Sequence, residues 1–307
     1  MVEAATTPPL RRWFVSLRAY SFTASLVPVA LALALAMGRS AGDGIAWWTL
    51  PLFTLSALLF HAGTNVLNDY YDFVHGVDTE DDDDPTHAIT QGVVTPRFMR
   101  ISGHLYFLLG VAVGLPIGLL RGWLFVLAGL LGAAGAFFYT SARFSFKYVA
   151  LGDIVVFFLM GPALVVMGLW ALTGTASAMS AVLTLPVALL VTAILHGNNL
   201  RNIHGDRTAG ISTLAGLLEV RGSKALFAAL VVLPHASVAA FVATGATAIP
   251  ALLPVFTLPA AGVLAYRVAR TADPARLVTL PLACARLHML FGLLYVAGLA
   301  AAGFLPL

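Results

Sequence analysis

Long apolar segments alternate with short polar ones along most of this chain. Nine of the apolar segments have the length of a membrane helix, and they cover residues 20–38, 46–68, 98–120, 122–140, 149–172, 178–200, 224–243, 248–267 and 287–306. A helix needs roughly 20 mostly apolar residues to cross a bilayer. The pattern therefore predicts an all-α, multispanning membrane bundle of nine transmembrane helices. We expect a single integral membrane domain over residues 1–307, with a polar tail at residues 1–17.

The composition excludes several classes of protein. Of the 307 residues, 60% are hydrophobic and only 10% are charged, a balance that soluble domains do not show. Cys284 is the only cysteine, which excludes an intrachain disulfide and a thiolate metal site. The chain carries no phosphate-binding glycine loop and no haem-attachment motif, so nucleotide and redox cofactors find no support.

Basic residues predict the orientation in the membrane. With the N-terminus inside, 15 of the 17 Lys and Arg residues fall on the inner side, and only Arg39 and Arg121 fall outside. Such a bias is typical of cytoplasmic loops. We therefore predict a multi-pass protein of the cell membrane whose N-terminus and longer loops are cytoplasmic. The net charge of +3 then reflects this topology, and we expect no nucleic-acid partner.

Two polar rows with helical spacing lie at the cytoplasmic ends of the second and sixth predicted spans. The first row is Asn65, Asn68 and Asp72, and the second row is Asn198, Asn202 and Asp206. Residues at these spacings share one face of a helix. Oxygen-only ligands suit hard cations, above all Mg²⁺, which uses one or two carboxylates together with phosphate oxygens and water.

The alternative interpretation is that the amides cap helix ends and the aspartates are solvated. Polar groups at the edge of a bilayer are costly to hold there, and two such rows on the same side favour a function. The rows therefore predict an enzyme that binds magnesium and a lipid diphosphate at the mouth of an apolar bundle.

Four basic residues are the candidates for holding a diphosphate, and they are Arg143, Lys147, Arg201 and Arg207. Cations stabilise the charge that develops on a leaving diphosphate. The positive-inside bias alone also explains basic residues at these positions. We favour Lys147, because Tyr139 and Asp153 bracket it at adjacent span ends.

Asp153 is the only acidic residue at the start of the fifth span. We predict that it orients Lys147 or serves as the base for an acidic phenol. The alternative is a carboxylate placed favourably at a helix N-terminus. Elsewhere, we interpret the acidic run at residues 80–84 as a solvated loop. The eight histidines show no metal-ligand spacing, so we interpret most of these histidines as packing residues.

Four ordered blocks of motif residues lie within residues 17–224. They are Leu17-Arg18 with residues 21–30, the segment Asn68–Phe73 with 76–78, the segment Lys147–Asp153 with Gly161-Pro162, and the segment Asn198–Asn202 with Asp206–Leu214. These blocks resemble the UbiA-type intramembrane aromatic prenyltransferases. Within the family, they look most like the 1,4-dihydroxy-2-naphthoate polyprenyltransferases of menaquinone biosynthesis and their animal relatives.

The resemblance implies nine helices around a central cavity and a role for each candidate residue. Asn68 and Asp72 would bind one magnesium ion, and Asn202 and Asp206 another. Tyr139, Arg143 and Lys147 would meet the diphosphate, Asn65 and Asn198 would support the rows, and Arg18, Arg201 and Arg207 complete the expected substrate-binding set. In this family the second motif usually opens with Asp rather than Asn202, which reduces the charge available to a second metal. Arg18-Ala19 also replaces the common Arg-Pro pair.

Together these features predict magnesium-dependent transfer of a polyprenyl chain to 1,4-dihydroxy-2-naphthoate, with loss of diphosphate and carbon dioxide, giving demethylmenaquinol. Other acceptors of the same class are 4-hydroxybenzoate, homogentisate, haem and chlorophyllide. An ion-coupled secondary transporter is a further alternative. It predicts polar groups near mid-span, whereas the polar rows of this chain lie at one membrane face. The partners expected are a polyprenyl diphosphate, an aromatic acceptor and membrane lipid. The sequence predicts neither the prenyl chain length nor the oligomeric state.

Overall fold

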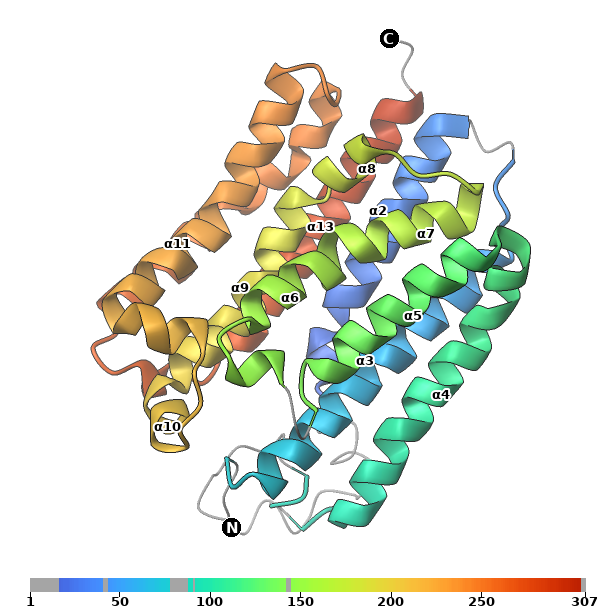
Figure 1. The fold of residues 1–307 in the computed structure, drawn as a ribbon. Coiled ribbons are helices and arrows are strands. Elements are labelled where there is room, and N and C mark those ends of the chain that lie inside the picture. The colour runs from blue at the N-terminus through green and yellow to red at the C-terminus, as the bar shows by residue number, and fades with distance from the viewer. Residues whose placement is uncertain (1–16, 41–43, 78–87, 91, 142–144, 305–307) are drawn as a thin grey trace.

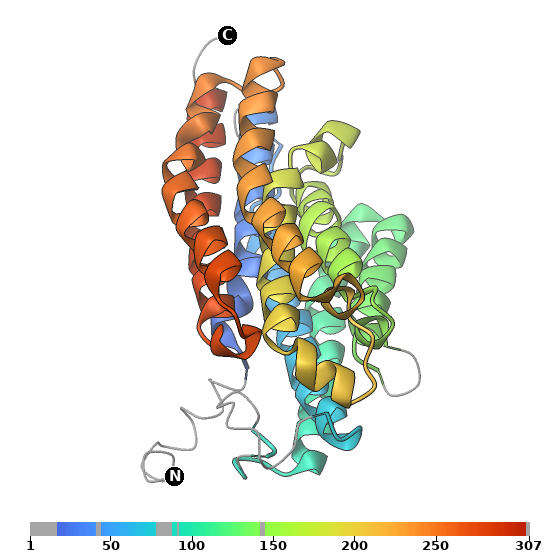
Figure 2. The ribbon, with the colours of Figure 1, turned by 90° about the vertical axis from the view of Figure 1, so that its left-hand side faces the viewer.

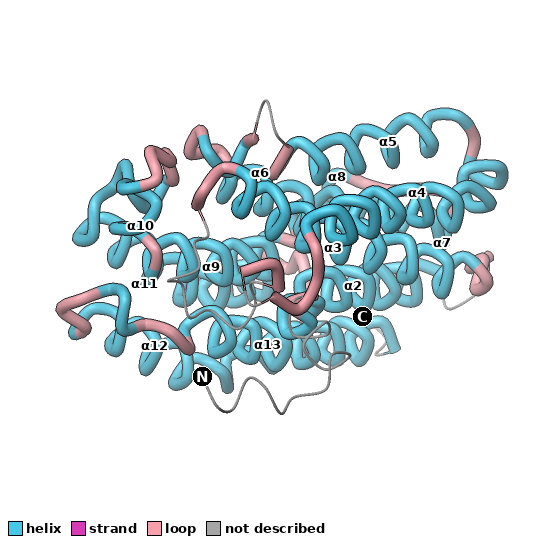
Figure 3. The backbone as a smooth tube through the Cα atoms, turned by 90° about the horizontal axis from the view of Figure 1, so that it is seen from below, coloured by secondary structure: helices cyan, strands magenta, loops and turns pink. Residues whose placement is uncertain are grey.

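A computed structural model describes residues 17–40, 44–77, 88–90, 92–141 and 145–304. These residues form a bundle of helices joined by loops (Figure 1; Figure 3). The described part of the chain has no strand and a single isolated parallel bridge, between Val149 and Ser212. The all-α class predicted from the sequence is therefore confirmed.

The elements run in chain order as follows: η2 (Ala19–Phe22), α2 (Thr23–Ser40), α3 (Thr49–Val74), α4 (Pro96–Arg121), α5 (Trp123–Phe138), η3 (Phe146–Tyr148), α6 (Gly152–Phe158), η4 (Leu159–Ala163), α7 (Leu164–Thr173), α8 (Ala178–Val182), α9 (Leu185–Arg201), α10 (Ile203–Thr208), α11 (Leu214–Ala243), η5 (Ile249–Thr257), α12 (Leu258–Arg270), η6 (Pro274–Arg276) and α13 (Leu280–Phe304).

Among the described residues, eight helical stretches are long and apolar enough to cross a membrane. The remaining predicted span, residues 122–140, is α5, a shorter apolar helix of 16 residues. Helix α4 shows how the sequence fixes such an element. The Thr95 side chain accepts a hydrogen bond from the Phe98 amide at 3.2 Å, Pro96 occupies the first turn, and Gly122 ends the helix with φ of 89°.

The largest hydrophobic core lies where α2, α7, α9, α11 and α13 pack together. Helices α3, α4 and α5 pack along one side of this centre, and α12 packs against α11 on the other side (Figure 1; Figure 2). The C-terminal end of α3 and the short helix α10 lie at the same end of the bundle (Figure 1). We call it the site end.

The fifth predicted span is not one regular helix. It consists of α6, the π-helical turn η4 and α7, with Pro162 inside η4. A proline lacks an amide donor and disrupts the α-helical hydrogen-bond ladder, and π-turns of this kind occur often at functional sites. At Gly161 an added Cβ would lie 2.4 Å from the Cβ of Ala188, so the turn lies directly against α9.

Helix boundaries differ from the predicted spans where polar residues continue a helix beyond its apolar part. Helix α3 runs on to Val74, so the first row lies on one continuous helix. Helix α11 starts at Leu214 rather than 224, with a kink at Glu219 (φ 56°), and α13 starts at Leu280 rather than 287. The predicted spans start later because Glu219, Arg221 and Arg286 lower the local hydropathy. The second row differs from its prediction, because α9 ends at Arg201 and α10 begins at Ile203, so the helix is interrupted at Asn202.

Candidate active site

The first row presents two oxygen ligands, Asn68 and Asp72, one turn apart near the end of α3. Both residues are buried, and the Asn68 Nδ2 donates a hydrogen bond to Asp72 Oδ2 at 2.7 Å. A second neighbour on the helix, Asp69, is also buried, but its Oδ2 accepts a hydrogen bond from the Ala88 amide at 3.0 Å. Asp69 therefore anchors the following loop, while Asn68 and Asp72 face the bundle interior.

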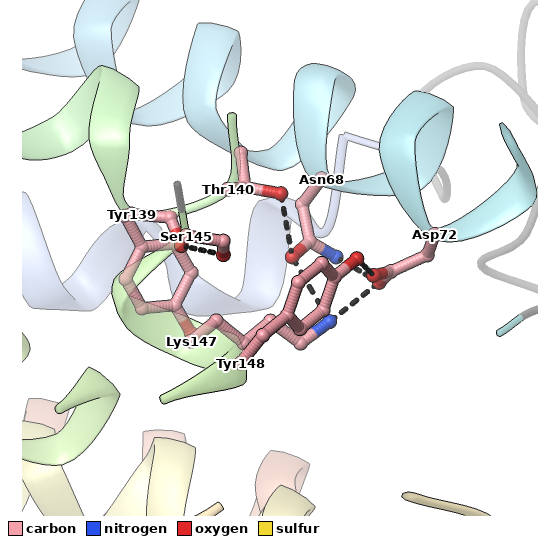
Figure 4. Close-up of polar contacts among 7 residues, drawn as sticks. All are labelled: Asn68, Asp72, Tyr139, Thr140, Ser145, Lys147 and Tyr148. Carbon is pink, nitrogen blue, oxygen red and sulfur yellow. Dashed lines mark hydrogen bonds and ion pairs between the residues drawn. The ribbon is translucent and has the colours of Figure 1, made fainter. Parts of the chain in front are cut away.

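Lys147 connects the first row to the loop before α6 (Figure 4). Its Nζ lies 2.5 Å from Asp72 Oδ2 and 3.1 Å from Asn68 Oδ1. The Tyr148 hydroxyl donates to Asp72 Oδ1 at 2.6 Å, and the Thr140 hydroxyl donates to Asn68 Oδ1 at 3.4 Å. Charge-assisted hydrogen bonds of this kind are stronger than neutral ones. Both oxygens of Asp72 are thus held in place.

Backbone contacts fix the loop that carries Lys147. The carbonyl oxygen of Tyr139 accepts hydrogen bonds from the Lys147 amide at 3.1 Å and from the Ser145 hydroxyl at 2.7 Å (Figure 4). The loop is also tied to the segment that follows the second row. The Ala150 amide donates to the Ser212 carbonyl at 2.7 Å, and the Ser212 amide donates to the Tyr148 carbonyl at 3.2 Å.

The second row comes close to the first at Lys147. Burial raises the pKa of Asp206 to about 6, Lys147 opposes this shift by its positive charge, and Asp72 adds to it by charge repulsion. Two carboxylates from helices far apart in the chain therefore interact electrostatically with one ammonium group. Arg201 donates from Nε to Asn202 Oδ1 at 2.9 Å at the break between α9 and α10.

Side chains from both rows line one cavity at the site end, which we call the polar cavity. Six of its lining residues were predicted as site residues, and they are Arg18, Asn65, Asn68, Tyr139, Lys147 and Asn198. The cavity wall is completed by apolar residues of α6, η4 and α9. The first row thus contributes Asn65 and Asn68 to this wall, and the second row contributes Asn198.

A second cavity, the apolar cavity, lies deeper in the bundle between α2, α3, α4, α5 and the segment from η4 to α7. Most of its wall consists of Phe, Leu, Ala, Gly and Met side chains. Five residues line both cavities and so mark the place where they meet: His61, Thr64, Ala136, Leu159 and Met160. A ligand with a charged head and a long hydrocarbon tail fits this sequence of surfaces.

The remaining predicted site residues have different surroundings. Asp153 does not line the polar cavity and is buried, with its Oδ1 3.1 Å from His196 Nδ1 and its Oδ2 accepting from Asn199 at 3.4 Å. Asn65 uses its Nδ2 to donate to the Leu17 carbonyl at 2.9 Å. Arg207 is exposed on α10, and Arg143 lies outside the described residues.

In the described part of the chain, no group of three or more His, Cys, Asp or Glu side chains forms a metal site. The donors that the two rows offer are carboxylate and amide oxygens. This set suits a magnesium ion that takes its other ligands from phosphate and water.

Three side chains of the candidate site were not among the predicted site residues. Tyr148 and Thr140 were missed because their contacts to Asp72 and Asn68 bring together distant segments. His61 had a detectable signal, since it precedes Asn65 by four residues and therefore extends the first row by one turn.

Comparisons with known proteins agree with this geometry. A model of the UbiA prenyltransferase family matches residues 25–290. The UbiA prenyltransferase domain-containing protein 1 of Homo sapiens is 36% identical over 313 residues, covering 97% of this chain and 88% of that protein. The Drosophila melanogaster homologue of that protein is 34% identical, covering 99% of this chain and 83% of the relative.

Solved structures share the fold. A UbiA homologue from Archaeoglobus fulgidus bound to GPP and Mg²⁺ has a TM-score of 0.61 at 15% identity, covering 93% of this chain and 99% of that chain. The apo structure of a UbiA homologue from Aeropyrum pernix has a TM-score of 0.62 at 16% identity, covering 89% of this chain and 98% of the other.

Proposed function

The chain belongs to the UbiA prenyltransferase family, and we propose that it transfers a polyprenyl chain from polyprenyl diphosphate to 1,4-dihydroxy-2-naphthoate, giving demethylmenaquinol. The observation that carries the proposal is the junction of the polar cavity with the apolar cavity. Lys147 and the asparagines Asn65, Asn68 and Asn198 line the first, and mostly apolar residues line the second. A polyprenyl diphosphate has a matching charged end and apolar tail.

The residues present fit a magnesium ion. Asp72 and Asp206 are the carboxylates that would hold it, together with the amide oxygens of Asn68 and Asn202. Their oxygen-only chemistry matches a hard cation, and the electrostatic coupling of both aspartates to Lys147 supports a common binding region. The Archaeoglobus fulgidus homologue was solved with GPP and Mg²⁺, which supports the same ligands here. When bound, the metal neutralises charge on the diphosphate.

Lys147 is the residue best placed to act on the leaving group. Lys147 lines the polar cavity, and Arg18 lines it as well. As the allylic C–O bond breaks, its electron pair leaves with the diphosphate, and fixed cations stabilise that charge. The surrounding apolar side chains exclude water from the allylic centre.

The acceptor completes the reaction from the other side of the allylic carbon. A ring carbon of the naphthoate forms the new C–C bond, and the carboxylate on that carbon leaves as carbon dioxide, which restores the aromatic ring. Holding donor and acceptor in one cavity turns their encounter into an oriented reaction within a complex. Another aromatic acceptor of the same class would use the same donor site.

The test is a reconstituted reaction. Purified protein is mixed with Mg²⁺, a polyprenyl diphosphate and either dihydroxynaphthoate, 4-hydroxybenzoate or homogentisate, and products are measured by mass spectrometry. We expect prenylated naphthoquinol, and we expect Asp72→Ala and Asp206→Ala each to remove most turnover. Asp273→Asn, a change at an exposed carboxylate of the loop before α13, should retain it.

Each outcome has a distinct meaning. A folded protein that prenylates a different acceptor would contradict the naphthoate assignment and leave the donor site intact. A folded protein that transfers no prenyl group to any of the three acceptors would contradict the proposed function.

A further inference from the structure

His61 lies where the two cavities meet. It is on α3, one turn deeper in the bundle than Asn65 and on the same helix face, and its side chain is buried. Of the five residues that line both cavities, only His61 and Thr64 are polar. The Thr64 hydroxyl donates to the Phe60 carbonyl of its own helix at 2.9 Å. His61 is therefore the polar group that links the start of the apolar cavity to another helix.

Two serines of the first membrane segment hold the imidazole. Ser25 Oγ lies 2.9 Å from Nδ1, and Ser21 Oγ lies 3.1 Å from Nε2. The Ser21 hydroxyl proton is directed to the Arg18 carbonyl at 2.8 Å, so Ser21 accepts from His61. Nε2 must then carry the imidazole proton, and Nδ1 accepts from the Ser25 hydroxyl. The hydrogen bonds thus specify one neutral tautomer.

His61 lies along α3 at the level where the acceptor, the second substrate, is expected to bind. Asn68 lies seven positions after His61, and a rise of 1.5 Å per residue places them about 10 Å apart along the axis. A diphosphate at Lys147 with its tail in the apolar cavity has its allylic carbon between these two levels. The ring that attacks this carbon must lie beside it, within reach of the His61 end of the polar cavity.

The hydrogen-bonding chemistry of His61 and Ser25 suits the aromatic acceptor better than the polyprenyl donor. A polyprenyl tail offers no group for hydrogen bonding, and the diphosphate is drawn to cations rather than to a neutral imidazole. A phenolic hydroxyl that leaves water for this apolar surrounding needs a new partner, because an unsatisfied buried polar group is costly. Ser25 lines the apolar cavity, and its oxygen retains a lone pair after its proton is given to Nδ1.

We propose that His61, together with Ser25, binds a ring hydroxyl of the phenolic or hydroquinone acceptor at the junction of the two cavities. This inference rests on the proposed function and deepens it, since it names the residues that recognise the second substrate. His61 fixes the orientation of the Ser25 hydroxyl, and the Ser25 oxygen accepts the hydrogen bond from the ring. The pair holds the ring beside the allylic carbon.

The experiment compares His61→Phe, His61→Gln and Ser25→Ala with the unchanged protein. Calorimetry measures binding of 1,4-dihydroxy-2-naphthoate without donor, and initial rates give a separate KM for each substrate. We expect His61→Phe and Ser25→Ala to weaken acceptor binding and to raise the acceptor KM about tenfold, the worth of one good hydrogen bond. The donor KM should stay within about twofold, and His61→Gln should recover part of the affinity.

A matched control is His235→Phe. His235 is also buried and also pairs with a hydroxyl, Thr257 at 2.8 Å, but it lines neither cavity. This change should leave both KM values unaltered. A thermal unfolding midpoint for each variant separates loss of binding from loss of fold. Ser25→Ala is the smallest change, so the test stays decisive even if His61→Phe does not fold.

Unchanged acceptor affinity in folded Ser25→Ala and His61→Gln would overturn the inference. A rise in the donor KM instead of the acceptor KM would overturn it as well, because His61 would then contact the prenyl chain. Failure of the unchanged protein to transfer any prenyl group would count against the proposed function itself, which is a separate result.

Discussion

At the scale of single residues, Lys147 is the cation that acts on a carboxylate of each row in the candidate site. Its ammonium group touches Asp72 and Asn68, and its charge also acts on Asp206. A cation placed between two carboxylates lowers the cost of burying both of them. The same cation faces the cavity where a diphosphate would leave, so one side chain serves both the assembly of the site and the proposed reaction.

The first prediction concerns this charge. Lys147→Ala should lower kcat/KM by about 10²- to 10³-fold, the usual loss when a preorganised charge-stabilising group is removed. Lys147→Arg should recover only part of the activity, because a planar guanidinium cannot reproduce the contacts of a compact ammonium. Initial rates with saturating acceptor give the measurement.

Lys224→Ala is the control for that prediction. Lys224 lies at the same end of the bundle, but its Nζ donates to the Thr271 carbonyl at 2.6 Å and does not line the polar cavity. Turnover should stay within about twofold of the unchanged protein. Equal losses in the Lys147 and Lys224 variants would show that overall positive charge, and not the position of Lys147, matters.

At the scale of elements, a buried hydrogen-bond network joins α6, α9 and α11. Asp153 of α6 pairs with His196 of α9, whose Nε2 lies 2.9 Å from the hydroxyl of Ser223 on α11. All three side chains are buried. This environment differs from that of a base exposed to substrate, and it holds α6, with the preceding Lys147 loop, against the rest of the bundle.

The second prediction separates these two roles for Asp153. Asp153→Ala should destabilise the fold by about 3 kcal/mol, the order expected for breaking a buried pair, and Asp153→Asn should cost less. Thermal unfolding in detergent measures this loss, and the rate per folded molecule should change little. A stable Asp153→Asn protein that has lost most turnover would instead support the base predicted from the sequence.

Helix α5 forms one wall of the apolar cavity, and small residues leave that wall open. At Gly132 an added Cβ would meet no atom within 4 Å, and the residue lines the cavity. The third prediction is that Gly132→Phe fills this space. Activity with a long polyprenyl diphosphate should fall about tenfold or more, while activity with a short donor such as dimethylallyl diphosphate should be retained.

Gly262→Phe on α12 provides the matched control. This glycine also has open space at its Cβ but lines neither cavity, so both donors should react as before. If Gly132→Phe reduced the rates with short and long donors by the same factor, the apolar cavity would not be the binding site of the tail.

At the scale of the whole molecule, the candidate site lies at one end of the bundle, where both rows, Lys147 and the polar cavity are found. The described residues include eight helical stretches of membrane-spanning length. The opposite end includes the turn after α11 and Arg121, which donates two hydrogen bonds to the Ala171 carbonyl near the C-terminus of α7. The cytoplasmic orientation of the site end, the cell-membrane location and the single domain over residues 1–307 stay predictions.

The fourth prediction tests the orientation. Single cysteines are introduced in a Cys284→Ala background at Ala272, an exposed position of the loop after α12, and at Thr244, an exposed position of the turn after α11. A thiol reagent that does not cross membranes should label Thr244→Cys in intact cells and Ala272→Cys only after permeabilisation. The reverse pattern would place the site end outside.

The sequence predicted the stripe of Asn65, Asn68 and Asp72 because local spacing determines which residues share a helix face, and α3 confirms that they lie on one helix. It did not predict the break at Asn202. Nor did it predict the π-turn at residues 159–163. Pro162 is a local cause of the π-turn, but the turn also lies against another helix, at the close approach of Gly161 to Ala188.

The sequence alone determined the all-α membrane class and the family, because apolar length and local motifs need no knowledge of distant contacts. Only the tertiary structure decided that Lys147 bridges to Asp72, that Asp153 turns to His196, and that His61 lies at the junction of two cavities. Each of these contacts joins residues that are far apart in the chain or on separate helices. Their partners are selected by how the helices pack, and packing depends on the shapes of many side chains at once rather than on any local pattern.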